Sequence, residues 1–162
     1  MPLKRTIEKA RKDKREGKSP STQASEFVHE EIDKIRRGEH GARSTKQAIA
    51  IGLSEARRAG VDLPPPKRGR ATDRTRKGAE YANEAGQGER KTKRRPRVSR
   101  GVLRALKREP RGSASHAALS RQARSSASQH SAAARKAART KGAAGRSAAG
   151  KNAARTRSRR RG

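Results

Sequence analysis

Apolar side chains recur at helical spacing in one short part of the chain, residues 19–63. Ser19 and Pro20 are typical of a helix start. One face of the segment that follows is apolar and consists of Ala24, Phe27, Val28, Ile32 and Ile35. The opposite face is charged and consists of Glu26, Glu30, Asp33 and Arg37. This alternation predicts an amphipathic helix, with Glu30, Glu31 and Asp33 exposed and Gly38 as its stop.

A second helix is predicted from a capping signal. Ser44 precedes Gln47 by three residues, which is the spacing of a capping box. Ile49, Leu53 and Ala56 then share a face. The small residues Ala48 and Gly52 beside this face would let the two helices approach closely. Gly60 ends the pattern, and prolines at 64–66 prevent its continuation. Residues 19–63 therefore predict an αα-hairpin.

The hairpin has few large apolar residues for its length. Nine of them must offset the conformational entropy lost by ordering about 45 residues. A dimer, a third helix from elsewhere in the chain or a binding partner would supply the missing burial. We expect self-association through residues 19–63.

The rest of the chain has a weaker apolar pattern. We interpret residues 1–18 as a basic N-terminal arm, 64–97 as a Pro/Gly/basic linker, 98–109 as a short amphipathic helix and 110–162 as an Ala/Ser/Arg-rich basic tail. The alanine-rich part of the tail, 116–140, would become helical once its charge is neutralised, because like-charge repulsion opposes the isolated helix. The predicted fold class is mostly disordered and low in complexity, with a small all-α element, the αα-hairpin; further short helices could form in the C-terminal tail.

Charge supports this division. The chain has 162 residues, with 45 Lys+Arg against 15 Asp+Glu, a net charge of +30, one Phe, one Tyr and no Trp. Low hydrophobicity with high net charge is typical of disorder. Residues 1–18 carry +5, residues 19–63 carry zero, residues 64–97 carry +8 and residues 98–162 carry +17. No acidic residue follows Glu109.

Two stretches carry a resemblance. The text STKQAIAIGLSEARRAG at 44–60, preceded by EFVHE at 26–30, resembles an uncharacterised family of small basic bacterial proteins with a KQAIAIxLSEA motif. Such proteins are sometimes labelled DNA-binding or plasmid-stabilisation proteins. The tail at 113–162 is similar to the basic tails of linker histones and bacterial histone-like proteins, although it is rich in Arg and Ser and has no Pro after Pro110. The resemblance of the tail implies phosphate binding and compaction, and not the reading of a base sequence.

We predict a non-sequence-specific DNA-binding protein, histone-like or nucleoid-associated, that neutralises phosphates. The alternatives are an RNA- or ribosome-associated basic protein and a protein-interaction module of a plasmid stabilisation or partition system. Base reading is not expected: Phe27 and Tyr81 are the only aromatic residues, and Arg57 and Arg58 are expected to be exposed and to complement a helix dipole. The predicted nucleic-acid-binding residues are Lys67, Arg68, Arg70, Arg90, Lys91, Lys93, Arg94, Arg95, Arg97, Arg135, Lys136, Arg139, Lys141, Arg155, Arg157, Arg159, Arg160 and Arg161.

Other classes of site find no support in the sequence. The chain has no Cys, and its histidines are scattered, so we expect neither a metal nor a cofactor. Those histidines are His29, His40, His116 and His130. No catalytic residue is predicted, because a chain with so small a core cannot hold a concave active site, and we expect that it is not an enzyme. No apolar run of 18 residues and no signal peptide occur, so we expect no membrane partner and a cytoplasmic location on the bacterial nucleoid.

Overall fold

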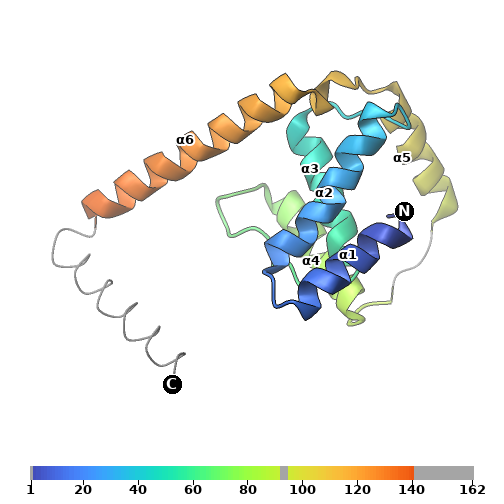
Figure 1. Ribbon diagram of the computed structural model, residues 1–162, viewed down its shortest axis with the longest axis horizontal. Helices are drawn as coiled ribbons and strands as arrows, with labels where there is room; N and C mark the ends of the chain where they lie inside the picture. The colour runs from blue at the N-terminus through green and yellow to red at the C-terminus, as the bar shows by residue number, and fades with distance from the viewer. Residues whose placement is uncertain (1, 92–94, 141–162) are drawn as a thin grey trace. The chain divides into compact units, whose positions relative to one another are not determined.

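The computed structural model describes residues 2–91 and 95–140, and this part contains six α-helices, one 3₁₀ turn and no strand (Figure 1). The helices are α1 (Lys4–Arg15), α2 (Pro20–Arg36), α3 (Thr45–Arg58), α4 (Asp73–Gln87), α5 (Pro96–Arg108) and α6 (His116–Thr140), with the turn η1 at Gly112–Ala114. The prediction of a mostly disordered chain is therefore wrong. The chain divides into two units, Met1–Leu119 and Ser120–Gly162.

The helices α2 and α3 begin where the capping signals predicted. The Ser19 hydroxyl accepts a hydrogen bond from the backbone N–H of Thr22 at 3.3 Å. At the start of α3 the Ser44 hydroxyl accepts from the N–H of Gln47 at 3.2 Å. Past the ends of α2 and α3, Gly38 and Gly60 adopt left-handed backbone with φ of +80° and +91°. Both predicted helices are thus confirmed, together with the glycines that stop them.

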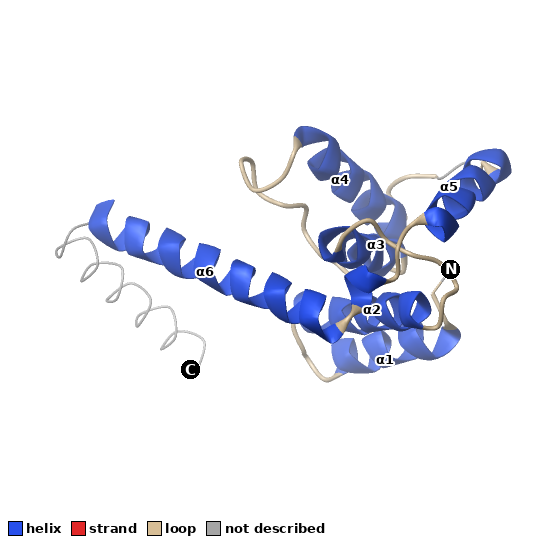
Figure 2. Ribbon diagram, turned by 90° about the horizontal axis from the view of Figure 1, so that it is seen from above, coloured by secondary structure: helices blue, strands red, loops and turns tan. Residues whose placement is uncertain are grey.

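Helix α2 is the centre of the Met1–Leu119 unit and packs against α1 and α3, and α3 also packs against α4 (Figure 2). One apolar cluster is built on Ala10, Ala24, Phe27, Ala56 and Val61. A second cluster is built on Ile32, Ile35, Ala42, Ala48 and Ala114. Helix α1 contributes Ala10 and Ile7 to the first cluster, and α4 packs against α3, so both add burial to the hairpin.

Small residues make these helix contacts possible. A Cβ atom on Gly52 of α3 would lie 2.7 Å from the Cα of Val28 in α2. A Cβ atom on Gly86 of α4 would collide with the carbonyl of Arg57 in α3. The buried residues of α4 are Ala79 and Ala82. A helix that packs through alanine and glycine has no stripe of large apolar residues, so apolar periodicity does not predict α4 within residues 64–97.

The residues that follow α5 also belong to the core. The carbonyl of Ala114 accepts a hydrogen bond from Nε of Arg36 at 3.0 Å, and the carbonyl of Ser113 accepts from Oγ1 of Thr45 at 2.7 Å. Ala114 is completely buried. The segment interpreted as the start of a basic tail at residue 110 is therefore packed against α2 and α3 up to Leu119.

The face of α2 that was expected to be solvent-exposed is partly buried and charged. Glu30, Glu31 and Lys34 are all buried. The Glu30 carboxylate accepts the backbone N–H of Leu3 at 3.0 and 3.1 Å. Nζ of Lys34 lies 2.6 Å from Glu30 and 3.3 Å from Glu55 of α3. Polar spacing suggests exposure, but Glu30 and Lys34 are buried and paired with the N-cap residue of α1 and with Glu55 of α3, which a single-helix pattern does not reveal.

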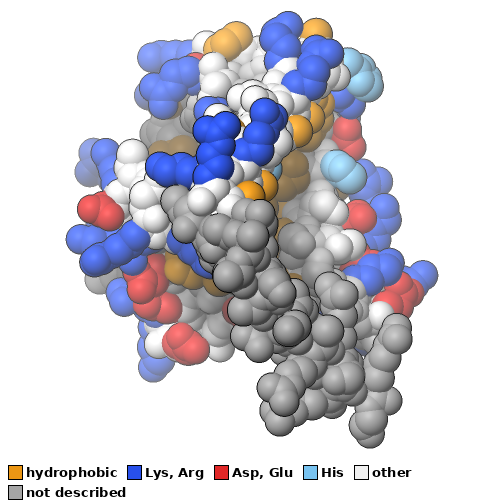
Figure 3. Space-filling view, turned by 90° about the vertical axis from the view of Figure 1, so that its left-hand side faces the viewer, with side chains coloured by type: hydrophobic (Ala, Val, Ile, Leu, Met, Phe, Trp, Pro, Cys, Tyr) orange, Lys and Arg blue, Asp and Glu red, His pale blue; other side chains and the backbone are white. Residues whose placement is uncertain are grey.

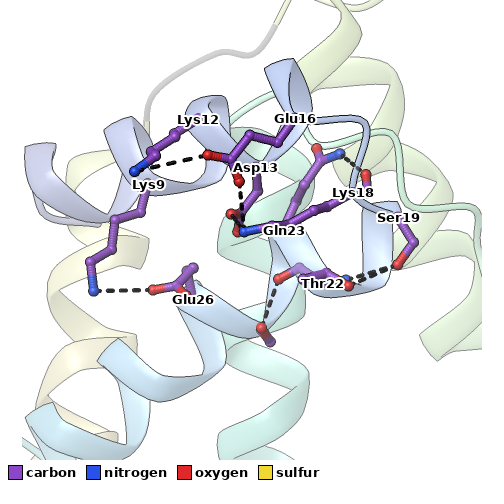
Figure 4. Close-up of polar contacts among 10 residues, drawn as sticks. Lys9, Lys12, Asp13, Glu16, Lys18, Ser19, Thr22, Gln23 and Glu26 are labelled. Atoms are coloured by element: carbon purple, nitrogen blue, oxygen red, sulfur yellow. Dashed lines mark hydrogen bonds and ion pairs between the residues drawn. The ribbon is translucent and has the colours of Figure 1, made fainter.

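The junction between α1 and α2 is held by a second polar group (Figure 4). Nζ of Lys18 lies 2.7 Å from Asp13 and 2.9 Å from Glu16, and its carbonyl accepts from Nε2 of Gln23 at 2.8 Å. The two carboxylates raise the pKa of Lys18. The ammonium group of Lys18 is therefore paired with carboxylates of its own fold.

Candidate nucleic-acid interface

Helix α6 carries its positive charge on one face. It contains no acidic residue, and its five cations are Arg121, Arg124, Arg135, Lys136 and Arg139. At about 100° per residue, these five positions fall within a sector of about 120°. They extend over about 27 Å at a rise of about 1.5 Å per residue. All five side chains are exposed. We call this set the α6 stripe.

The remainder of α6 explains why it is helical. Nine of its 25 residues are alanine, the residue with the highest helix propensity. Arg124 and Arg135 are separated by about 16 Å along the axis, beyond the screening length of about 8 Å at physiological salt. Repulsion between these two parts of the stripe is therefore weak. This corrects our expectation that neutralisation is needed before the segment becomes helical.

The structure brings together only some of the predicted residues. Arg135, Lys136 and Arg139 lie in the α6 stripe. The others that it describes are exposed: Lys67, Arg68 and Arg70 in the loop between α3 and α4, Arg90 and Lys91 after α4, and Arg95 and Arg97 at the start of α5. The remaining predicted residues, Lys93, Arg94, Lys141, Arg155, Arg157, Arg159, Arg160 and Arg161, lie outside the described residues.

Arg90 is engaged within its own unit. Its Nε lies 2.7 Å from a carboxylate oxygen of Glu84, and its guanidinium carbon lies 5.0 Å from the centre of the Tyr81 ring. A phosphate would have to compete with both contacts. Arg90 is therefore a weaker candidate than the cations of α6.

Two members of the stripe, Arg121 and Arg124, were absent from the sequence prediction. Neither arginine belongs to a dense run of cations, because both are isolated in the sequence. Their signal is helical spacing instead, because Arg121 and Arg139 differ by 18 residues, or five complete turns. A search for cations in phase along an alanine-rich segment would have found them.

Some cations of the Met1–Leu119 unit serve the fold. Arg57, expected to be exposed, is buried. Its guanidinium donates to the carbonyls of Leu63, Leu53 and Pro64 at 2.9, 3.4 and 3.3 Å. Burial lowers the pKa of Arg57. The residue ties the end of α3 to the chain that follows and is removed from any interface.

The buried carboxyl groups differ in their electrostatics. Burial tends to raise the pKa of Glu30, but hydrogen bonds from Lys34, Thr6 and the Leu3 N–H outweigh it, so the pKa lies below its ordinary value. Burial tends to lower the pKa of Lys34, yet Glu30 and Glu55 raise it overall. In both cases pairing overcomes the cost of desolvation.

For Glu31, in contrast, the effect of burial on the pKa outweighs that of its oppositely charged neighbours. Burial raises its pKa, nearby His40 opposes this, and Glu55 adds to it. Nε2 of His40 lies 3.5 Å from Oε1 of Glu31, and this oxygen has no hydrogen-bond partner within the described part of the chain. No group of three or more His, Asp or Glu residues suited to a metal ion occurs among the described residues.

A small pocket lies beside the apolar cluster that includes Ala10, Phe27 and Val61. Its volume is about 110 Å³, and its wall includes Ile7, Phe27 and Val61 together with Arg11 and Lys14. Ligand pockets for nucleotides and drug-sized molecules span roughly 300–1,000 Å³. The pocket is too small for a nucleotide.

On the face presented in Figure 3, Lys and Arg side chains are widely spread, with acidic side chains in smaller groups among them.

Among the described residues, no helix has the length and apolar character needed to cross a bilayer.

Residues 14–68 match the model of a family of unknown function (DUF6496). The match covers the end of α1, all of α2 and α3, and part of the loop before α4. It agrees with the resemblance of this region to an uncharacterised family, and it brings no function with it. Comparison with curated proteins and with solved structures gives no match. The α6 stripe lies outside the matched residues.

Proposed function

We propose that this chain binds nucleic acid, duplex DNA in preference to RNA, by contacting phosphates rather than reading bases. The observation that carries the proposal is the α6 stripe: five exposed cations on one face of a helix that has no acidic residue. Arginine suits this task because its planar guanidinium donates two parallel hydrogen bonds to a phosphate. Four of the five cations in the stripe are arginine.

The geometry of the stripe fits a duplex. The major groove of B-DNA admits an α-helix, and phosphates on either side of it lie within reach of long side chains. Alanine and serine dominate the rest of α6, so no bulky group prevents close approach. The same residues offer few hydrogen bonds to base edges, which favours positioning contacts over sequence recognition.

The charge of the whole unit supports the same function. Residues Ser120–Gly162 contain 13 Lys and Arg and no Asp or Glu. Each phosphate that such a segment neutralises releases condensed counterions, which makes binding strongly dependent on salt. We infer a histone-like, nucleoid-associated role on this basis.

The test is a salt series of DNA binding by the full chain and two variants of α6. One variant replaces all five stripe cations with Gln. The other exchanges arginine and alanine positions, as R121A/A123R, A134R/R135A and A137R/R139A, which moves three arginines to the other side of α6 without altering composition. Fluorescence anisotropy with a labelled duplex gives the affinity at each salt concentration.

We expect the Gln variant to reduce the magnitude of the slope of log K against log salt by about 4.5, because each of the five phosphate contacts contributes about 0.9. The exchanged variant should bind more weakly than the original chain at every salt concentration, although its charge is unchanged. Equal binding by the exchanged variant would show that composition alone matters. An unchanged slope in the Gln variant would remove α6 from the interface.

Competition between duplex DNA and structured RNA at one fixed salt concentration tests the choice of nucleic acid. We expect the duplex to displace the RNA. The reverse order would favour the RNA- or ribosome-associated alternative.

A further inference from the structure

Helix α5 separates apolar from basic side chains more completely than any other part of the Met1–Leu119 unit. One face is apolar and consists of Val98, Val102, Leu103, Ala105 and Leu106. The opposite face is basic and consists of Arg97, Arg100, Arg104, Lys107 and Arg108. At about 100° per residue, the centres of the two faces lie about 180° apart. No acidic residue occurs within the helix.

The apolar face of α5 is not used by the fold. Within the described residues α5 packs against no other helix. Val98, Val102 and Leu103 are 57%, 54% and 46% exposed. In the part of the chain that the structure describes, α5 is fixed at its C-terminal end, where the Leu106 carbonyl accepts the N–H of Gly41 at 2.9 Å. Exposed apolar side chains gathered on one helix face indicate an interaction surface.

The charge of α5 decides among the partners that could cover this face. Nucleic acid would satisfy the cations but offers little apolar surface to the valine and leucine side chains. A second copy would bring two helices of five cations each to an interaxial distance of about 8–10 Å, without an acidic residue on either helix to pair with them. A bilayer that contains anionic lipids supplies an apolar interior and a negatively charged surface together.

We propose that α5 lies in the surface of a bilayer that contains anionic lipids. Its apolar face enters the boundary between acyl chains and headgroups, and its Arg and Lys side chains contact lipid phosphates. The expectation of no membrane partner rested on the absence of a spanning segment, and a helix that lies in the plane of the surface needs none. Its attachment at Gly41 leaves the N-terminal part of α5, with Val98 and Val102, accessible to such a surface.

A tryptophan reporter tests the proposal directly, because the chain contains no Trp. Val102→Trp places the reporter on the apolar face. Gly101→Trp is the matched control: Gly101 lies toward the basic face, has open space around it, and its replacement alters no charge. Each full-length variant is mixed with vesicles of phosphatidylcholine and phosphatidylglycerol, with vesicles of phosphatidylcholine alone, and with duplex DNA.

We expect the emission of Val102→Trp to move to shorter wavelength, and to be quenched by brominated acyl chains, only with the vesicles that contain phosphatidylglycerol. Gly101→Trp should keep the emission of a tryptophan in water. A shift of Val102→Trp with DNA alone would assign the apolar face to nucleic acid. A shift that depends on protein concentration without lipid would assign it to a second copy. Either result, or no shift at all, would overturn the proposal.

Vesicle cosedimentation at high salt, where attraction by the polycationic remainder is screened, provides a second readout. Val102→Ser with Leu103→Ser should weaken binding about tenfold or more, because two half-exposed apolar side chains lose their burial in lipid. Leu3→Ser with Tyr81→Ser removes side chains that are 39% and 41% exposed and should leave binding unchanged. Equal losses in both pairs would contradict a role for α5. DNA affinity should be unaffected by either pair, which separates this proposal from the function proposed for α6.

Discussion

Glu31 is a buried carboxylate of the core whose hydrogen bonding is incomplete. It is 1% exposed, and Oε1 has no hydrogen-bond partner among the described residues. Its neighbour Glu30 has the Leu3 N–H and Lys34 as partners, whereas Glu31 faces His40 at 3.5 Å and is less well compensated. A buried charge without full hydrogen bonding costs stability.

Replacing Glu31 with Gln should therefore stabilise the protein at neutral pH by roughly 1 kcal/mol. The raised pKa means that the folded state holds the proton more strongly than the unfolded state. The cost of ionised Glu31 is thus present above its folded-state pKa and is lost as the pH falls below the ordinary value of 4.5. Urea unfolding of Glu31→Gln and the original chain should differ at pH 7 and converge near pH 4. Asp33→Asn, at an exposed position on the same helix, is the control and should show no gain at pH 7.

Arg57 and Arg58 are adjacent arginines with different roles. We expect Arg57→Ala to lower the free energy of unfolding by about 2–3 kcal/mol, because it leaves the carbonyls of Leu63, Leu53 and Pro64 without this donor. Arg58 is exposed, and Arg58→Ala should change stability by less than about 0.5 kcal/mol. Thermal unfolding followed by circular dichroism measures both. Equal effects would mean that the buried guanidinium does not secure the end of α3.

At the scale of elements, the sequence predicts the helices that carry conventional signals. Ser19, Ser44 and the glycines that stop α2 and α3 are local features, and large apolar residues mark the faces of both helices. Helices α1 and α4 have no comparable stripe, since α4 packs through Ala79, Ala82 and Gly86. Their positions depend on complementary shape in another part of the chain, which periodicity does not contain.

The same reasoning applies to the candidate interface. Counting dense runs of cations finds Arg135, Lys136 and Arg139, but Arg121 and Arg124 become part of the stripe only once 116–140 is treated as one helix. Charge counts alone also assign Arg57 and Lys34 to the accessible cations, whereas both are buried. The sequence thus specifies the sign and amount of charge, and the packing of the helices determines which charged side chains a partner can reach.

The contact between α2 and α3 leads to a prediction with a control of identical chemistry. Gly52→Ala should destabilise the protein by about 1–3 kcal/mol, because the new methyl group would lie 2.7 Å from the Cα of Val28 and both backbones would have to move. Gly78→Ala adds the same methyl group to α4, where nothing lies within 4 Å. It should stabilise by up to about 1 kcal/mol through helix propensity. Denaturant unfolding compares the two, and a loss in both variants would show that the close approach at Gly52 is not the cause.

At the scale of the whole molecule, the net charge of a unit does not measure how many of its cations a partner can reach. The unit Met1–Leu119 carries 32 Lys and Arg with 15 Asp and Glu, a net charge of +17. The unit Ser120–Gly162 carries +13 with no acidic residue. In the first unit, several cations are paired or buried, including Lys18, Lys34 and Arg57. Acidic side chains elsewhere on its surface would repel a polyanion, so its larger net charge need not give tighter binding.

This contrast predicts the behaviour of the two units made separately. If net charge alone governed binding, residues 1–119, which carry +17, would bind DNA more tightly than residues 120–162, which carry +13. We expect the reverse order, because the unit that holds the α6 stripe contains no acidic residue that would repel a polyanion. Residues 1–119 should unfold at nearly the temperature of the full chain, since both apolar clusters lie within them. Anisotropy titrations of both fragments at one salt concentration decide the order, and tighter binding by 1–119 would place the DNA-binding surface on the helical core.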